Sequence, residues 1–185
     1  MNKKILNLGC GNDKYGTHFI DLYPSRADVV KCNFDKERLP FPNDYFDEVY
    51  SRNVLEHIKN LGFVFEEIIR VLKPKGKLVL ITDNASYYLY HVSKKHSAHY
   101  DRYGAHGSED RHFSLFTTKH LENFCKVFDL KIEKLRPLTD FYPPDKIILY
   151  PTKNSRLYWI NRIVSKLPSG SRIAYPRLLL IANKR

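Results

Sequence analysis

The chain has 185 residues, a formal net charge of +11 and three cysteines. This length suffices for one domain with its own hydrophobic core, and no stretch approaches the roughly 20 apolar residues that cross a bilayer. An odd number of cysteines without CxxC spacing argues against a disulfide framework and against a cysteine zinc site. We therefore expect a single soluble domain over residues 1–185.

The amino-terminal segment bears on the compartment. Two lysines precede Ile5, but no apolar core of the length that an export signal needs follows them. We expect a cytoplasmic protein.

Short apolar runs and helical stripes alternate along the chain. Two apolar patterns with helical spacing predict helices over 53–72, ended by the Pro74-Lys75-Gly76 turn, and over 117–128. Strands alternating with helices predict an α/β protein with a parallel sheet covered on its faces. The compact apolar runs predict strands at 4–9, 18–22, 27–32, 46–50, 76–82, 130–135 and 177–182.

One segment, 84–114, interrupts this alternation with histidines and tyrosines and few aliphatic residues. We expect it to leave the core and to form a lid over a substrate. Its histidines show neither an HxH nor an HExxH pattern, so we predict a substrate-binding or solvated loop and no metal site. The five histidines of this segment are His91, His96, His99, His106 and His112.

The carboxy-terminal part carries the positive charge. No acidic residue follows Asp145, and we expect a basic, amphipathic insertion at 139–176. Its predicted helix over 155–167 lies either on the core or on an acidic membrane surface, which would make the protein peripheral to the membrane. The charge favours an anionic partner such as a phosphorylated substrate or acidic lipid, or it is a solvated face. Nucleic acid is less favoured because no RNA-binding module is visible.

Candidate binding residues follow three successive predicted strands. Gly9 and Gly11 allow a sharp turn with close approach of a ligand. Asp21 ends the next strand, where a carboxylate can accept hydrogen bonds from ribose hydroxyls, and Asn33 and Phe34 end the third, where they can contact an adenine. The carboxyl ends of such strands form the crevice in which open α/β sheets bind ligands.

These features, in their order and spacing, resemble the class I S-adenosylmethionine-dependent methyltransferases. The similarity rests on the motifs at 6–12, at Asp21, at 39–49, 54–57, 71–78 and 112–117. It implies a doubly wound, mostly parallel seven-stranded sheet with helices on both faces. The 12–17 stretch is too short for the usual first crossover helix. This shortened connection resembles that of small methyltransferase-domain proteins of glycan biosynthesis.

The resemblance assigns roles to individual residues. Gly9, Cys10, Gly11 and Asn12 would line the methionine part of S-adenosylmethionine, Asp21 would hold its ribose, and Leu22, Asn33 and Phe34 would contact its adenine. Asp35 is an alternative adenine contact. Ser51 and Asn53 would border the methyl group, or they would cap the following helix.

Catalysis by methyl transfer needs alignment and, for a hydroxyl acceptor, a base. His57 is the candidate base, with simple packing at the helix start as the alternative reading. A nicotinamide dehydrogenase fits poorly, because Lys14 occupies the place of the third glycine of GxGxxG.

Two functions therefore remain open from the sequence. One is transfer of a methyl group to a small acceptor, such as a saccharide or a phosphorylated or lipid-linked glycan hydroxyl. The other is a non-catalytic module that binds S-adenosylmethionine or a partner. The trimmed first crossover and the lack of helices before the first strand favour the second reading.

Overall fold

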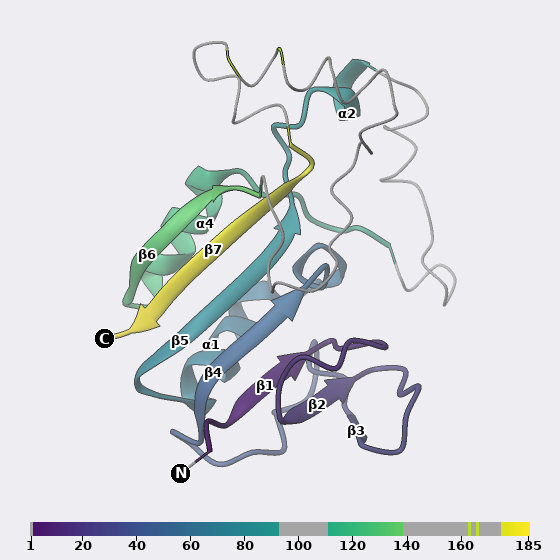
Figure 1. Cartoon of the computed structure of the whole chain (residues 1–185), viewed down its shortest axis with the longest axis vertical. Helices are drawn as coiled ribbons and strands as arrows, with labels where there is room; N and C mark the ends of the chain where they lie inside the picture. Colours follow the sequence, from purple (N-terminus) through teal and green to yellow (C-terminus); the bar gives the residue numbers. More distant parts are fainter. Residues whose placement is uncertain (1, 93–110, 139–162, 164–165, 167–174) are drawn as a thin grey trace.

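The computed structural model describes residues 2–92, 111–138, 163, 166 and 175–185. Within them seven strands form one twisted sheet in the order β3-β2-β1-β4-β5-β7-β6 (Figure 1). The strands are β1 (Ile5–Leu8), β2 (His18–Asp21), β3 (Val29–Lys31), β4 (Phe46–Arg52), β5 (Leu72–Asp83), β6 (Leu130–Pro137) and β7 (Arg177–Lys184).

Strand direction separates the sheet into two parts. Neighbouring strands from β3 to β5 pair in parallel, whereas β7 is antiparallel to both β5 and β6. Every predicted strand is present, and the predicted mostly parallel seven-stranded α/β fold is confirmed. Because parallel strands end at the same edge, the loops after β1, β2, β4 and β5 meet there.

The two longer helices, α1 (Leu61–Val71) and α4 (Thr118–Val127), cover one face of the sheet (Figure 1). Their side chains share one core with the strands, and the Phe65 and Phe124 rings stack with centroids 4.7 Å apart. The expectation of helices on both faces is not met by the part of the chain that is described. The physical reason is that the connections at 9–17 and 22–28 are too short to form helices.

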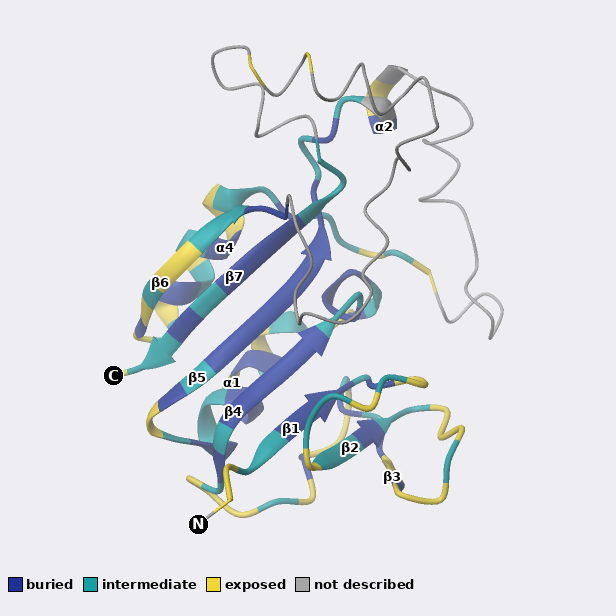
Figure 2. Ribbon diagram, in the orientation of Figure 1, coloured by how far each residue is buried: buried dark blue, intermediate teal, exposed yellow. Residues whose placement is uncertain are grey.

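Tyr15 covers part of the second face in place of a crossover helix. Its ring meets Tyr50 edge-on with centroids 4.7 Å apart, and its hydroxyl donates to Glu48 Oε1 at 2.7 Å. Asn7 Nδ2 donates to the Tyr15 carbonyl at 3.0 Å. The shortened first crossover that the sequence predicted is therefore confirmed, and one aromatic side chain anchors it to the sheet. Figure 2 shows how the burial is concentrated along β4, β5 and β7.

The predicted helix over 53–72 was too long. Residues Leu55–His57 form a single 3-10 turn, η1, and Ile58 then adopts an extended backbone with φ −88° and ψ 128°. α1 begins only after Asn60, whose side chain accepts a hydrogen bond from the Phe63 amide. The chain leaves the helical conformation at Ile58 and re-enters it at the Asn60 cap, so the turn and α1 are separate elements.

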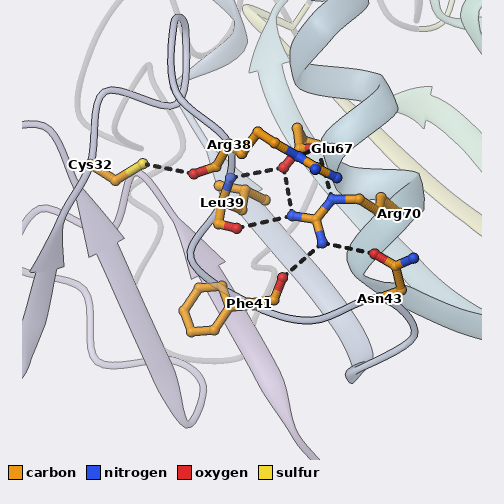
Figure 3. Close-up of polar contacts among 7 residues, drawn as sticks. All are labelled: Cys32, Arg38, Leu39, Phe41, Asn43, Glu67 and Arg70. Carbon is orange, nitrogen blue, oxygen red and sulfur yellow. Dashed lines mark hydrogen bonds and ion pairs between the residues drawn. The ribbon is translucent and has the colours of Figure 1, made fainter.

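A buried carboxylate fastens the loop before β4 to α1 (Figure 3). Glu67 accepts hydrogen bonds from the Leu39 amide at 2.8 Å and from Arg38 Nε at 3.2 Å. Arg70 donates to the same carboxylate and to the carbonyls of Leu39 and Phe41. Hydrogen bonds from Arg70 lower the pKa of Glu67, so the charge is stabilised despite burial.

The two predicted insertions both start and end near the carboxyl end of β5. A parallel bridge between Asn84 and Phe116 closes the base of the first insertion, and α2 (Leu89–Val92) lies within that insertion. The Leu138 amide donates to the Arg177 carbonyl at 2.8 Å, which closes the base of the second. Most of both insertions, including His96, His99 and His106, lies outside the described residues. Among the residues described, no helix has both the length and the apolar character needed to cross a membrane.

Candidate functional site

A cavity of about 600 Å³ lies where the loops after β1, β2, β3 and β4 meet. Its position is the crevice at the carboxyl ends of the strands, where α/β sheets bind ligands. The predicted cofactor residues that line it are Gly9, Cys10, Gly11, Asn12, Asp21, Leu22, Asn33, Phe34 and Asn53, and His57 lines it as well.

The glycine turn after β1 is held by backbone geometry. Gly9 has φ +71° and Gly11 has φ +50°, in the left-handed region that favours glycine. A Cβ at Gly9 would come within 2.3 Å of Val54 Cγ2, whereas one at Gly11 would meet nothing within 4 Å. Gly9 therefore allows the close approach of the β1 and β4 loops, and Gly11 leaves space inside the cavity.

Asp21 organises the same turn from the end of β2. Its Oδ2 accepts from the Gly11 amide at 2.8 Å and its Oδ1 from the Tyr23 amide at 2.8 Å. Each carboxylate oxygen offers two lone pairs, so both retain capacity for a ligand's hydroxyl groups. Asp21 thus both shapes the loop and presents the acceptor pair that a ribose requires.

The wall after β3 combines an apolar ring with polar groups. Phe34 is buried, and Asn33 lines the cavity beside it. Asp35, the alternative adenine contact, also lines the cavity, but its Oδ1 accepts from the Asn60 amide at 2.7 Å. One Asp35 oxygen is therefore engaged in fixing the start of α1.

Ser51 and Asn53 differ in position although they flank Arg52, the last residue of β4. Asn53 has φ +55°, and its amide donates to the Ile81 carbonyl at 2.8 Å. Its side-chain Oδ1 is buried and has no hydrogen-bond partner among the described residues. Ser51 is buried, donates to the Leu8 carbonyl at 2.9 Å, and is absent from the described lining of the cavity. Neither caps η1, whose N-cap is Val54 without a side-chain hydrogen bond.

Cys10 lies in the cavity wall as an unreactive thiol. Burial raises its pKa to about 11, and the Asp21 carboxylate adds to this effect. A thiol with this pKa is almost fully protonated near neutral pH. Cys10 therefore acts as a small apolar group and not as a nucleophile.

The cavity also contains cations that were not predicted from the sequence. Lys36, Arg52 and Lys59 line it, with Arg52 lying 3.6 Å from Asp13 and Lys59 placed 4.7 Å above the Phe113 ring. Arg52 could have been predicted, because it lies between Ser51 and Asn53, which were both predicted to border the methyl group. Lys59 could not be located from the sequence, because the break after η1 brings it to the cavity.

A second cluster of polar side chains, next to the cavity, lies at the ends of β4 and β5. It contains Glu56, His57, Asp83 and His112. Burial raises the pKa of Glu56, and the nearby Asp83 carboxylate raises it further. His57 Nδ1 lies 3.1 Å from the Arg111 carbonyl, and the two histidine rings, His57 and His112, meet edge-on with centroids 4.5 Å apart. In the sequence, Glu56 and His57 belong to one motif and His112 to another, so their contact was not predicted. Asp83, at the end of β5, was the available signal, because the carboxyl ends of strands in such sheets form functional sites.

Comparison with known sequences identifies the family. The model of a family described as "Methyltransferase domain" matches residues 2–135. A phosphoethanolamine N-methyltransferase of Plasmodium falciparum is 26% identical over 164 residues, which cover 76% of this chain and 58% of the relative. Phosphoethanolamine N-methyltransferase 1 of Zea mays is 32% identical over 103 residues, covering 44% of this chain and 20% of the relative. The chain thus spans less than two thirds of these relatives.

Solved structures share the fold over nearly the whole chain. An S-adenosylmethionine-dependent methyltransferase from Archaeoglobus fulgidus has a TM-score of 0.64 at 15% identity, covering 98% of this chain and 86% of its own. Another from Mesorhizobium loti has a TM-score of 0.59 at 17% identity, covering 98% and 90%. These similarities establish the Rossmann-like fold of class I methyltransferases.

Proposed function

The chain belongs to the methyltransferase-domain family, and we propose that it is an enzyme that transfers the methyl group of S-adenosylmethionine to a small acceptor. The cofactor supplies an electrophilic methyl group on a sulfonium. The protein has to align that group with the acceptor and to exclude water from it.

The buried Asn53 oxygen carries this proposal. A buried polar atom without a hydrogen-bond partner is costly, and a ligand bound in the cavity can supply that partner to Asn53 Oδ1. The Asn53 oxygen could accept a hydrogen bond from the ammonium group of the methionine part of the cofactor, near the glycine turn. Asp21 would hold the ribose, and Phe34 with Leu22 would receive the adenine.

We place the acceptor at the η1 side of the cavity, where His57 is part of the wall. The Arg111 carbonyl can only accept a hydrogen bond, so His57 Nδ1 carries the proton and Nε2 keeps its lone pair when the ring is neutral. This tautomer supports our proposal, made first from the sequence, that His57 is the base that receives a proton from a hydroxyl acceptor.

We further propose that the acceptor is anionic. The basic carboxy-terminal part, which has no acidic residue after Asp145, supports this. The lining cations Lys36, Arg52 and Lys59 share the cavity wall with Asp13, Asp21 and Asp35, so they would contact an anion singly and not as an excess of charge. A saccharide or a phosphorylated or lipid-linked glycan hydroxyl is our specific candidate, and a phosphorylated amine is suggested by the names of two relatives. Cytoplasmic location with peripheral membrane contact through 155–167 belongs to the same proposal. In that segment, Ile163 is 64% exposed.

Calorimetric titration with S-adenosylmethionine and its demethylated product tests the cofactor site. Asp21→Asn keeps one oxygen for the loop amides but removes the charge, and we expect at least tenfold weaker binding, since hydrogen bonds to a charged group are worth about 1.5–3 kcal/mol. Asp28→Asn is the matched control, because Asp28 is exposed, forms an ion pair with Arg26 and does not line the cavity. Absence of binding by the wild-type protein would refute the proposal.

Turnover separates the enzyme from a non-catalytic module. Labelled S-adenosylmethionine incubated with phosphorylated sugars, glycan lipids and phosphorylated amines should transfer label to one class. Tight cofactor binding without transfer to any class would support the alternative of a binding module.

A further inference from the structure

Three side chains of types that commonly bind metals come together at the cavity wall, of which His57 is a part. Glu56 and His57 lie on η1, and His112 comes from a segment far away in the sequence. The amides of Phe113 and Ser114 donate to the Glu56 carbonyl, which attaches that segment to η1. One ligand atom from each of Glu56, His57 and His112 lies within 4.8 Å of the others.

Each of the three side chains has an outer partner that orients it. The Thr82 hydroxyl donates to Glu56 Oε2 at 2.8 Å, and His57 Nδ1 donates to the Arg111 carbonyl. His112 Nδ1 lies 3.4 Å from Asp83 Oδ2. Metal-binding histidines almost always have one ring nitrogen held by a carbonyl or carboxylate, which leaves the other nitrogen for the ion.

The charge at this place also favours a cation. Glu56 is 1% exposed and Asp83 is 4% exposed, so two carboxylates are buried near each other. Burial of charged groups costs several kcal/mol unless they are paired or coordinate a metal. A divalent ion between Glu56 and the two imidazoles would neutralise this charge.

We propose that Glu56, His57 and His112 bind a divalent transition-metal ion, with zinc as the best match to two imidazoles and one carboxylate. Around a tetrahedral zinc with bonds of about 2.0–2.1 Å, neighbouring ligand atoms lie roughly 3.3 Å apart, so small side-chain rotations close the site. This departs from the sequence-based expectation of no metal. Three protein ligands leave the fourth position open, as in catalytic zinc sites.

The open position gives the ion a role at the acceptor. Because His57 lines the cavity, an acceptor hydroxyl bound there would complete the coordination, and the ion would lower the pKa of that hydroxyl. His57 would then act as a ligand in place of a base. This role rests on the proposed methyl transfer, whereas binding of the metal does not.

Metal binding is tested on the full chain without S-adenosylmethionine. After dialysis against a chelator, the protein is titrated with Co²⁺ and followed by its visible absorption, and then competed with Zn²⁺. We expect one equivalent of Co²⁺, with tetrahedral or five-coordinate bands that Zn²⁺ removes. Glu56→Gln and His112→Gln should each weaken binding at least tenfold, and Asp83→Asn, acting through His112, by about 10–100-fold.

His91→Ala is the matched control. His91 is exposed, belongs to the same 84–114 insertion as His112, and contacts the Ala85 carbonyl at the start of that insertion. It should bind as the wild type does. No visible band, or binding that persists in both Glu56→Gln and His112→Gln with native circular dichroism, would overturn the site. Cobalt binding without binding of S-adenosylmethionine would refute the proposed function alone, and the reverse result would refute the metal site alone.

Discussion

The glycine turn at the cavity allows a quantitative test of why Gly9 is a glycine. Gly9→Ala meets two separate obstacles, the left-handed backbone at φ +71° and a contact of 2.3 Å with Val54 Cγ2. A left-handed backbone costs an L-residue roughly 1–2 kcal/mol, and overpacking a core typically adds about 1–3 kcal/mol. We expect the free energy of unfolding to fall by about 2–5 kcal/mol.

Two other glycines separate these contributions. Gly11→Ala has the left-handed backbone at φ +50° without any neighbour within 4 Å, so only the backbone cost of roughly 1–2 kcal/mol applies. Gly62→Ala has neither obstacle and lies in the first turn of α1, where alanine should stabilise by about 0.5–1 kcal/mol.

Urea denaturation followed by circular dichroism measures the series. In a Val54→Ala background the 2.3 Å contact is removed and only the Cβ of residue 54 remains, at 3.3 Å, so most of the excess cost of Gly9→Ala over Gly11→Ala should be lost there. The reasoning is refuted if Gly9→Ala in the wild type is no more destabilising than Gly11→Ala, or if Val54→Ala leaves its cost unchanged.

Three further predictions follow from buried groups. Glu67→Gln should lower the free energy of unfolding by about 3 kcal/mol in urea denaturation, against less than about 0.5 kcal/mol for Glu122→Gln, which is partly exposed and forms a surface ion pair with Lys119. Because the folded pKa of Glu67 is lowered, its contribution is present above the ordinary value of 4.5 and should shrink as the pH falls further; an undiminished difference at pH 3 would contradict this. Native Cys10, with a pKa near 11 against 9.0 when unperturbed, should be alkylated by iodoacetamide at pH 8 at least about 100-fold more slowly than in urea, as read by mass spectrometry; equal rates would show an exposed thiolate. Tyr15→Phe removes the hydroxyl that donates to the buried Glu48 and should cost about 1.5–3 kcal/mol in thermal or urea unfolding, with Tyr15→Leu costing more; a neutral Tyr15→Phe would mean that this hydroxyl does not anchor the crossover.

The cofactor side of the cavity was largely predictable from local sequence. Gly9, Asp21 and Phe34 each follow a short apolar run, and the carboxyl ends of parallel strands meet at one edge of the sheet. Recognising the strands therefore sufficed to place these residues together. Whether they bind the cofactor stays a prediction until the titrations above are made.

Helix boundaries were less predictable. The apolar residues from Val54 to Leu72 have helical spacing, but Ile58 is extended and divides them into η1 and α1. Periodicity records which side chains face the core, and a turn followed by a helix can satisfy it as well as one helix can. The break brings Lys59 to the cavity, which periodicity did not indicate.

The sequence by itself determined the order of the elements, the parallel sheet and the short first crossover, because apolar runs, glycine turns and connection lengths are local properties. Only the tertiary structure decided that both longer helices share one face, and that Tyr15 supports the sheet beside Tyr50. It alone brought His112 to Glu56, His57 and Asp83. Such contacts join residues distant along the chain, and their geometry depends on how loops close over the sheet, which no local pattern encodes.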